Sequence, residues 1–283
     1  MKPPAFDYAR PDTLDEALAL LSEFGPDATL LAGGMSLGAM LNMRLARPGI
    51  VIDLNRVPGL DRIETRNGHV TTGARVRQAV AMKDSGLIEA IPMLGLALPH
   101  VGHYQTRNRG TLGGSVAHAD PSAEIPLCLV ACGGAVTLSS KRGTRVVAAA
   151  DFFHGPLTTA RAPDELITAL NWPRDPNAGS GFAEIAQRHG DFAIAAAAAR
   201  ATVRGGAIFS LSFALGGIED RPRAFDTSAF IGAPATAETA QEISNQAARE
   251  VDPVSDLQAN ADYRRHLAAL LGARAINQAL DNV

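Results

Sequence analysis

Residues 107–126 read Arg-Asn-Arg-Gly-Thr-Leu-Gly-Gly-Ser-Val-Ala-His-Ala-Asp-Pro-Ser-Ala-Glu-Ile-Pro, which places three glycines shortly before a helix start. Gly110, Gly113 and Gly114 allow close approaches that a Cβ would prevent, and amide N–H groups in such a loop can point at an anion. Asp120 is a suitable N-cap for a helix whose first residue is Pro121. Glycines followed by a helix N-terminus are typical of a phosphate-binding site.

A second glycine loop of the same character occurs earlier in the chain. An apolar strand ending at Ala32 runs into Gly33-Gly34 and then into Met35 and Ser36, of which Ser36 is a candidate N-cap. Each loop alone is equally consistent with an ordinary turn between a strand and a helix. Two such loops in one chain predict a site that holds a pyrophosphate from both sides.

The two loops together resemble those of a known family. Ala32-Gly33-Gly34-Met35-Ser36 and Thr111-Leu112-Gly113-Gly114-Ser115 are similar to the pyrophosphate loops of the FAD-binding medium subunit of the molybdenum hydroxylases, the group of xanthine dehydrogenase and carbon monoxide dehydrogenase. The resemblance covers essentially the whole chain, through matching runs at 119–124, 188–193 and 215–217.

The resemblance also implies a role for individual positions. The backbone of the two loops would cradle the FAD phosphates, and Glu124 would stand at the adenosine ribose. Phe192 matches an aromatic residue that covers the isoalloxazine in some members, with an ordinary core phenylalanine as the alternative. Other positions would line the flavin or lie in the strand beneath it. The implied cofactor-binding set is Ala32, Gly33, Gly34, Met35, Ser36, Leu37, Val101, Gly110, Thr111, Gly113, Gly114, Ser115, Ala117, Glu124, Leu166, Ile167 and Phe192.

The sequence departs from the family pattern at one place. Many members carry a lysine near the reactive edge of the flavin, shortly after the domain boundary, where this chain has Phe182-Ala183-Glu184-Ile185. A positive charge beside the ring stabilises the reduced, anionic flavin, so its absence favours reoxidation. This difference leaves the electron acceptor open, including whether NAD serves.

Composition excludes several classes of partner. The chain has 283 residues, of which 46% are hydrophobic, and 26 basic against 29 acidic residues are dispersed along it. Such a chain supports a large core and shows no basic patch for nucleic acid or for a membrane surface. No signal peptide and no apolar run of roughly 20 residues occurs, so we expect a cytoplasmic protein without membrane insertion.

The residues that commonly carry chemistry do not form a set. Cys128 and Cys132 lie in an apolar stretch and are expected to be core residues, since an iron–sulfur cluster needs four ligands. His100 and His103 have no third ligand at metal spacing, so they are interpreted as loop or surface histidines. Asp191 is expected to pair with Arg188. The sequence therefore predicts a bound cofactor, with no catalytic residue and no metal site of its own.

Local patterns divide the chain into elements. Thr13 and Glu16 form a capping box for a helix that ends at Gly25, and further helices are expected at 36–45, 76–91, 236–250 and 257–281. Strands are expected at 28–32, 50–54, 135–139, 144–148 and 166–172, with a hairpin through Asn67-Gly68. The five alanines near 195–199 favour helix by propensity. The resemblance implies instead a strand at 192–203 that pairs with 208–215.

The predicted fold is α+β. The resemblance implies a two-subdomain FAD-binding domain of the vanillyl-alcohol-oxidase/PCMH-like type at 1–176, with subdomains of about 1–56 and 57–176. A smaller α+β domain with an antiparallel sheet and helices would follow at 177–283. The Pro- and Gly-rich stretch at 172–181 marks the expected junction.

The predicted function is that of the flavoprotein subunit of a heterotrimeric molybdenum hydroxylase. Its FAD would receive electrons that begin at a molybdenum cofactor on a large subunit and pass through two-iron, two-sulfur clusters on a small subunit. The FAD would then deliver them to an external acceptor. Two alternatives stay open at this point: a stand-alone FAD oxidase or reductase of the same fold, and a non-redox scaffold that binds a nucleotide.

Overall fold

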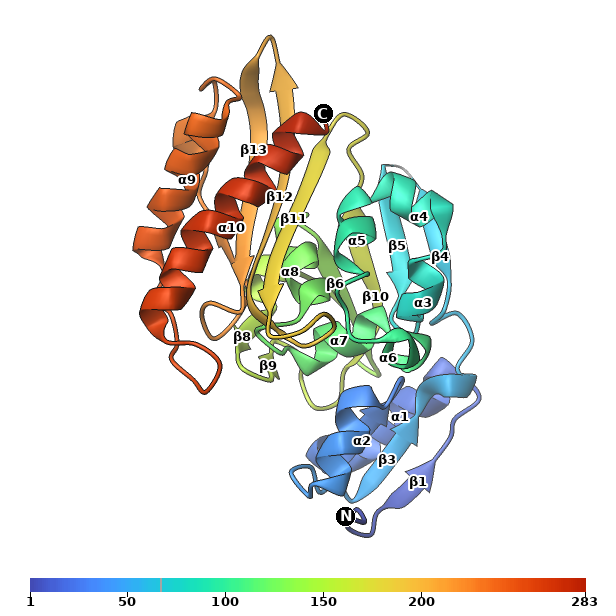
Figure 1. Cartoon of the computed structure of the whole chain (residues 1–283). Coiled ribbons are helices and arrows are strands. Elements are labelled where there is room, and N and C mark those ends of the chain that lie inside the picture. The colour runs from blue at the N-terminus through green and yellow to red at the C-terminus, as the bar shows by residue number, and fades with distance from the viewer. Residues whose placement is uncertain (67) are drawn as a thin grey trace.

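The structure is a computed structural model that describes residues 1–66 and 68–283. Its N-terminal part is a small parallel sheet in the order β1-β3-β2, with helices α1 and α2 beside it (Figure 1). Thr13 caps α1 by accepting a hydrogen bond from Glu16 N, and Gly25 ends the helix, as predicted. The predicted capping box is only half formed, because the Glu16 carboxylate accepts from Asp12 N, one residue before the cap. The elements are β1 (Asp7–Ala9), α1 (Leu14–Phe24), β2 (Ala28–Leu31), α2 (Met35–Asn42), β3 (Ile50–Asp53) and 3-10 helices at Gly25–Asp27 and Leu54–Arg56.

A central antiparallel sheet in the order β4-β5-β10-β6-β7 follows, with short helices packed against it (Figure 1). Trp172 on β10 is fully buried and donates its indole N–H to Thr72 on β5 at 3.0 Å, which ties the two strands together. The elements are β4 (Ile63–Arg66), β5 (His69–Gly73), α3 (Gln78–Ala81), α4 (Ser85–Ala90), α5 (Pro92–Ala97), α6 (Tyr104–Arg109), α7 (Leu112–His118), α8 (Glu124–Ala131), β6 (Ala135–Ser140), β7 (Gly143–Ala148), a 3-10 helix (Ala149–Asp151), β8 (Phe153–Gly155), β9 (Thr158–Thr159) and β10 (Leu166–Pro173).

The last part is an antiparallel sheet in the order β11-β12-β13-β14, covered on its outer face by two long helices (Figure 1). Cβ atoms at Gly179 and Gly181 would clash with backbone carbonyls of α10, so these glycines let the helix lie close on β11. The elements are β11 (Gly179–Ala186), β12 (Ala193–Arg204), β13 (Ala207–Gly216), β14 (Arg223–Phe225), a 3-10 helix (Ser228–Phe230), α9 (Ala237–Glu250) and α10 (Ala261–Asp281).

The alanine run forms strand β12, as the resemblance implied and against its helix propensity. Ala196 and Ala198 pack into the core around α8 and the central sheet. Ala195 and Ala197 point the other way, into the core beneath α10. Successive side chains of a strand alternate between faces, and here both faces are buried. Small side chains fit between the two packed layers. Tertiary packing therefore outweighs the helix propensity of alanine at this strand.

Several predicted boundaries were wrong, among them the start of the last helix, which is Ala261 and not residue 257. The helix expected from Pro121 begins at Glu124, because Asp120 accepts from Ser122 N at 2.9 Å in a turn and does not cap a helix. Helix α2 begins at Met35 with Gly34 as its N-cap, so Ser36 lies inside it. The helix expected at 76–91 is divided into α3 and α4, since Asp84 caps a new helix. The turn residue Asn67 lies outside the described residues.

Candidate functional site

The two glycine loops lie in backbone contact with each other. A Cβ placed on Gly33 would clash with the carbonyl oxygen of Arg109 and would lie 3.0 Å from the Cα of Gly110. Only glycine permits this approach, because any larger residue would push the loops apart. The two loops that the sequence interpretation assigns to one pyrophosphate site therefore lie next to each other in the fold, although they are distant in the chain.

The N-terminus of α2 has unused hydrogen-bond donors. Gly34 adopts φ +74°, a left-handed conformation that favours glycine, and no side chain caps the helix. Among the described residues, no acceptor is paired with the amide N–H groups of Met35, Ser36 or Leu37, whereas Gly38 N already bonds to Gly34 O. Free amides at a helix N-terminus are suited to an anion, so the first loop fits a diphosphate.

The second loop differs from the sequence interpretation, in which its amides also face the phosphates. Leu112 N donates to Val76 O at 2.9 Å, and Gly113 N donates to Ala74 O at 3.0 Å. Gly114 N donates to the Thr111 hydroxyl at 3.0 Å. The first two amides join the start of α7 to the segment 74–76 that follows β5, and the third is used by the N-cap of α7 itself. The glycines of this loop thus serve close packing, and Ser115 on α7 is half-buried.

The remaining predicted positions fall into two groups by exposure. Val101, Leu166 and Ile167 are buried, so their side chains belong to the packed interior. Ala117 is exposed on α7, and Phe192 is 51% exposed just before β12. The alternative reading of Phe192 as an ordinary core phenylalanine is therefore wrong. Its ring is free to cover a bound group.

Glu124 is buried at the start of α8, and sequence reasoning missed its acidic partner Glu184. Burial raises the pKa of Glu124 to about 7, with a further contribution from Asp120. Burial likewise raises the pKa of Glu184 to about 8, and the charge of Glu124 adds to this effect. A protonated carboxyl group can donate as well as accept a hydrogen bond. In the sequence, residues 182–185 stood out only because the lysine of the family pattern is absent there.

Glu184 also has capacity for a bound group. Its Oε1 lies 3.7 Å from His100 Nδ1, and its buried Oε2 has no hydrogen-bond partner among the described residues. Burial lowers the pKa of His100, and neighbouring His189 lowers it further. The contact at neutral pH is therefore between an uncharged imidazole and a carboxyl group, which leaves Oε2 available.

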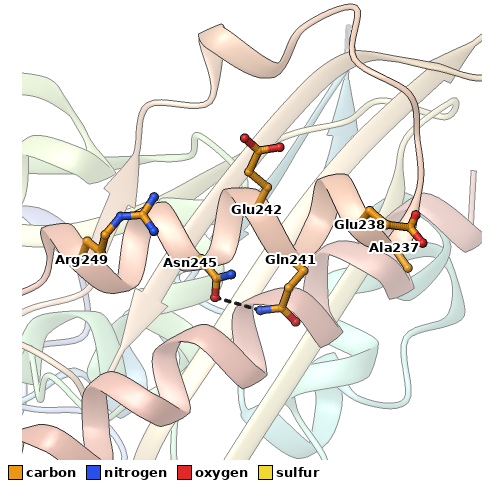
Figure 2. A pocket seen from close by; sticks show the side chains of 6 residues that line it. All are labelled: Ala237, Glu238, Gln241, Glu242, Asn245 and Arg249. Atoms are coloured by element: carbon orange, nitrogen blue, oxygen red, sulfur yellow. Dashed lines mark hydrogen bonds between the residues drawn. The ribbon is translucent and has the colours of Figure 1, made fainter.

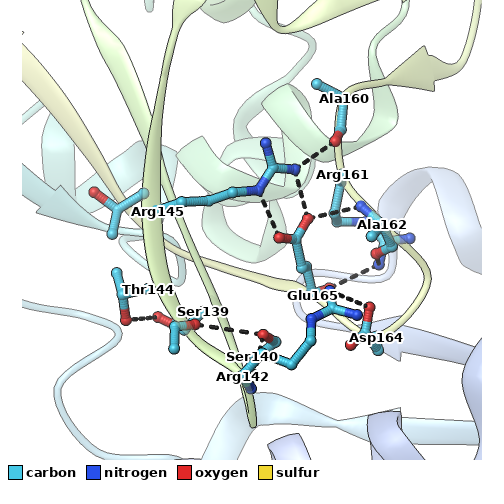
Figure 3. Close-up of polar contacts among 12 residues, drawn as sticks. Ser139, Ser140, Arg142, Thr144, Arg145, Ala160, Arg161, Ala162, Asp164 and Glu165 are labelled. Atoms are coloured by element: carbon cyan, nitrogen blue, oxygen red, sulfur yellow. Dashed lines mark hydrogen bonds and ion pairs between the residues drawn. The ribbon is translucent and has the colours of Figure 1, made fainter.

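An ion pair between the buried Glu165 and the exposed Arg145 fixes the segment that leads into β10. Glu165 receives two hydrogen bonds from Arg145, with Nε–Oε1 at 2.6 Å and Nη2–Oε2 at 2.7 Å (Figure 3). Ala162 N donates to the same carboxylate at 2.7 Å, and Arg145 also donates to Ala160 O. Leu166 follows directly, so this clamp sets the start of the strand predicted to lie beneath the flavin.

Glu165→Gln is expected to lower the free energy of unfolding, because it removes the carboxylate that Arg145 binds. The loss should be only about 1–2 kcal/mol, because the Arg145 side chain is partly exposed and water screens the interaction. The hydrogen bonds from Arg145 lower the pKa of Glu165 below its ordinary 4.5. Its contribution is therefore complete above that pH and is lost as pH falls through the lower, folded value. Chemical denaturation across this pH range should show the wild-type advantage shrinking below pH 4.5.

The matched control is Glu64→Gln, which removes a carboxylate from an exposed pair with Arg66. It should change stability by less than about 0.5 kcal/mol. A pH-independent difference for Glu165→Gln would show that the clamp is not electrostatic.

Other candidate groups do not assemble. Within residues 1–66 and 68–283, no three His, Cys, Asp or Glu side chains are placed to hold a metal ion. Cys128 and Cys132 are buried, as expected. Arg188 and Asp191, both described, are joined by a backbone hydrogen bond of 3.0 Å and not by the predicted ion pair.

A hollow lies on the outer face of α9, away from both glycine loops (Figures 1 and 2). Gln241 donates to Asn245 there at 3.0 Å across one helical turn. It is an open polar surface on one helix, so it does not resemble a cofactor site. As for membranes, the described part of the chain contains no helix with the length and apolarity needed to cross a bilayer.

Comparisons with known proteins give matches over nearly the whole chain. Residues 4–175 match the family described as "FAD binding domain in molybdopterin dehydrogenase", and residues 180–279 match "CO dehydrogenase flavoprotein C-terminal domain". The nicotine 6-hydroxylase medium subunit of Paenarthrobacter nicotinovorans is 39% identical over 283 residues, covering 99% of each chain.

Solved structures are similar over the same length. A carbon monoxide dehydrogenase from Hydrogenophaga pseudoflava that lacks the Mo-pyranopterin moiety of its cofactor is 32% identical, with a TM-score of 0.97, over 100% of this chain and 99% of that one. Quinoline 2-oxidoreductase from Pseudomonas putida 86 is 35% identical, with a TM-score of 0.94, over 99% of both chains.

Proposed function

Because the chain belongs to the family of FAD-binding medium subunits of molybdenum hydroxylases, we propose that it relays electrons from iron–sulfur clusters of a partner subunit to an external acceptor. The observation that carries the proposal is the open N-terminus of α2 lying against the backbone of the second loop. This arrangement fits the diphosphate of FAD. The described residues contain no group of three or more His, Cys, Asp or Glu side chains placed to hold a metal ion. In this proposal the electrons enter from another chain.

The chain's own residues have distinct tasks in this proposal. The amides of Met35, Ser36 and Leu37 bind the diphosphate, with the Ser115 hydroxyl opposite them. Glu124 hydrogen-bonds a ribose hydroxyl. Val101, Ala117, Leu166 and Ile167 line the flavin, and the exposed ring of Phe192 covers it. When bound, FAD supplies the ability to accept two electrons and release them one or two at a time.

The lysine that many family members carry near the flavin is absent here, and two acidic residues with buried side chains, Glu124 and Glu184, bear on the charge of this region. Glu184 lies on β11 with its carboxyl group buried beside His100, and its raised pKa keeps it protonated at neutral pH. The neighbouring pKa of about 7 at Glu124 keeps the pair from carrying two full negative charges. We propose that this neutral environment leaves reduced flavin less stabilised than a lysine would, which favours transfer to the acceptor.

The proposal extends to partners and domain limits. A large subunit with the molybdenum cofactor and a small subunit with two-iron, two-sulfur clusters would complete a heterotrimer. The FAD-binding domain would end near residue 176, between Pro173 of β10 and Gly179 of β11, and the C-terminal domain would begin at 177.

Purified protein is expected to carry FAD without a covalent bond, because the site offers free amides and no cysteine or histidine assigned to a flavin link. The measurement is flavin absorbance followed by acid precipitation and chromatography of the supernatant, where the colour should run as free FAD. Colour retained in the pellet would favour a stand-alone oxidase with covalent flavin. A colourless chain that FAD cannot reconstitute would favour the non-redox scaffold.

A further inference from the structure

We propose that Arg77 is a positioning residue that holds the two FAD loops at a fixed spacing, an inference that rests on the proposed role of those loops. Arg77 Nη1 donates to the carbonyl oxygen of Arg109, which directly precedes the second loop. Its Nη2 donates to Asn55 Oδ1 at 2.6 Å. Asn55 Nδ2 in turn donates to the carbonyl oxygen of Ala32 at 3.0 Å. Two side chains thus connect the backbone of one loop to that of the other.

The orientation of the Asn55 amide is set by its neighbours. Asp53 Oδ1 accepts hydrogen bonds from Asn55 N at 2.9 Å and from Asn55 Nδ2 at 2.5 Å. Tyr8 donates to the other oxygen of Asp53 at 2.5 Å. Burial raises the pKa of Asp53, but the hydrogen bonds from Tyr8 and Asn55 outweigh it and keep the carboxylate ionised. A carboxylate only accepts, so the amide nitrogen faces Asp53 and the amide oxygen faces Arg77.

The backbone of Arg77 belongs to the same connection. It forms a β-bridge with Thr111, and Gln78 N donates to Gly110 O at 3.0 Å. A Cβ on Gly110 would clash with the side chain of Gln78. The segment 77–78 is therefore joined to the second loop through its main chain, while the guanidinium reaches across to the first subdomain through Asn55.

Positive charge also collects at this position. Burial lowers the pKa of Arg77, and the charges of Arg109 and Arg75 lower it further. The guanidinium remains protonated at neutral pH. Repulsion among these cations would be relieved by a diphosphate bound between the loops. An effect of Arg77 on FAD binding therefore has two separate explanations. If its charge alone matters, Arg77→Lys should bind FAD like wild type. If the hydrogen-bonded bridge matters, Arg77→Lys should bind FAD more weakly.

The test compares FAD dissociation constants of apoprotein carrying Arg77→Lys, Arg77→Gln or Asn55→Ala. Each is expected to weaken FAD binding roughly 10- to 100-fold, because hydrogen bonds to a charged group are lost even when lysine keeps the charge. Arg77→Gln combined with Asn55→Ala should lose no more than the worse single variant, since both break one connection. The control Arg56→Gln removes an exposed arginine beside Asn55 and should bind FAD like wild type.

Two further measurements separate positioning from general stability. With FAD saturating, the phosphorus NMR signals of the bound diphosphate should shift in Arg77→Lys and stay in place in Arg56→Gln. The melting temperature of the apoprotein should fall far less than FAD affinity does, and Asn55→Ala carries the test if Arg77 variants do not fold. Wild-type affinity in Arg77→Lys, or unmoved phosphorus signals, would overturn the inference. Failure of the wild-type chain to bind FAD would overturn the proposed function instead.

Discussion

Gly33→Ala is expected to lower the affinity for FAD by roughly 100-fold, equivalent to about 2.7 kcal/mol. The added methyl would clash with the carbonyl oxygen of Arg109 and press on the Cα of Gly110, both of which are backbone atoms. The loops would have to separate, and the free amides of α2 would then lie out of register with the second loop. Isothermal titration of apoprotein with FAD measures the loss directly.

The matched control is Gly86→Ala, which adds the same methyl in helix α4. The new Cβ would lie 3.5 Å from the carboxylate of Asp84, an ordinary contact. Alanine is favoured over glycine inside a helix by roughly 0.5–1 kcal/mol, so this variant should be as stable as wild type or more stable, with unchanged FAD affinity. If Gly33→Ala binds FAD as tightly as Gly86→Ala does, the contact between the loops is not part of the site.

In the isolated chain, an organic substrate is expected to leave the flavin fully oxidised, whereas in the complex with both partners the same substrate should bleach it. Among the described residues, no three His, Cys, Asp or Glu side chains are placed to hold a metal ion. In the proposed relay, electrons reach FAD from a cofactor on another chain. Anaerobic stopped-flow absorbance of the isolated chain and of the co-expressed complex gives the comparison.

This experiment also tests the partner surface. Electron transfer needs cofactors held close together, and a stable interface of that kind buries about 800 Å² or more on each partner. The complex should therefore survive size-exclusion chromatography. Reduction of the flavin by substrate in the isolated chain would replace the relay with a self-sufficient oxidase.

Sequence reasoning located the loops but misjudged how one of them works. Gly33 and Gly34 were recognised because paired glycines between a strand and a helix have a local signature. The amides of Leu112 and Gly113 bond to Val76 and Ala74, which are distant in the chain, so only the fold shows that those two amides are already used. The same holds for the proximity of Glu184 to His100.

Local structure was predictable where local chemistry determines it. The N-cap at Thr13 needs only residues within one helical turn, and it was confirmed. The alanine strand was predictable only from resemblance, because its propensity favours helix and its two buried faces are created by α8 and α10. Asp120 and Asp84 show the limit of cap signals, since one makes a turn and the other caps a helix.

The two faces of β12 have a consequence for how the polypeptide can be divided. Ala196 and Ala198, together with Phe182 of β11, complete the apolar interior that also contains α8 and Trp172. A fragment cut at residue 176 would leave that interior open to water along one side. We expect a protein truncated there to aggregate, because this apolar surface is exposed. The part of the chain that carries both glycine loops would then not fold on its own, since the C-terminal sheet covers one side of its core.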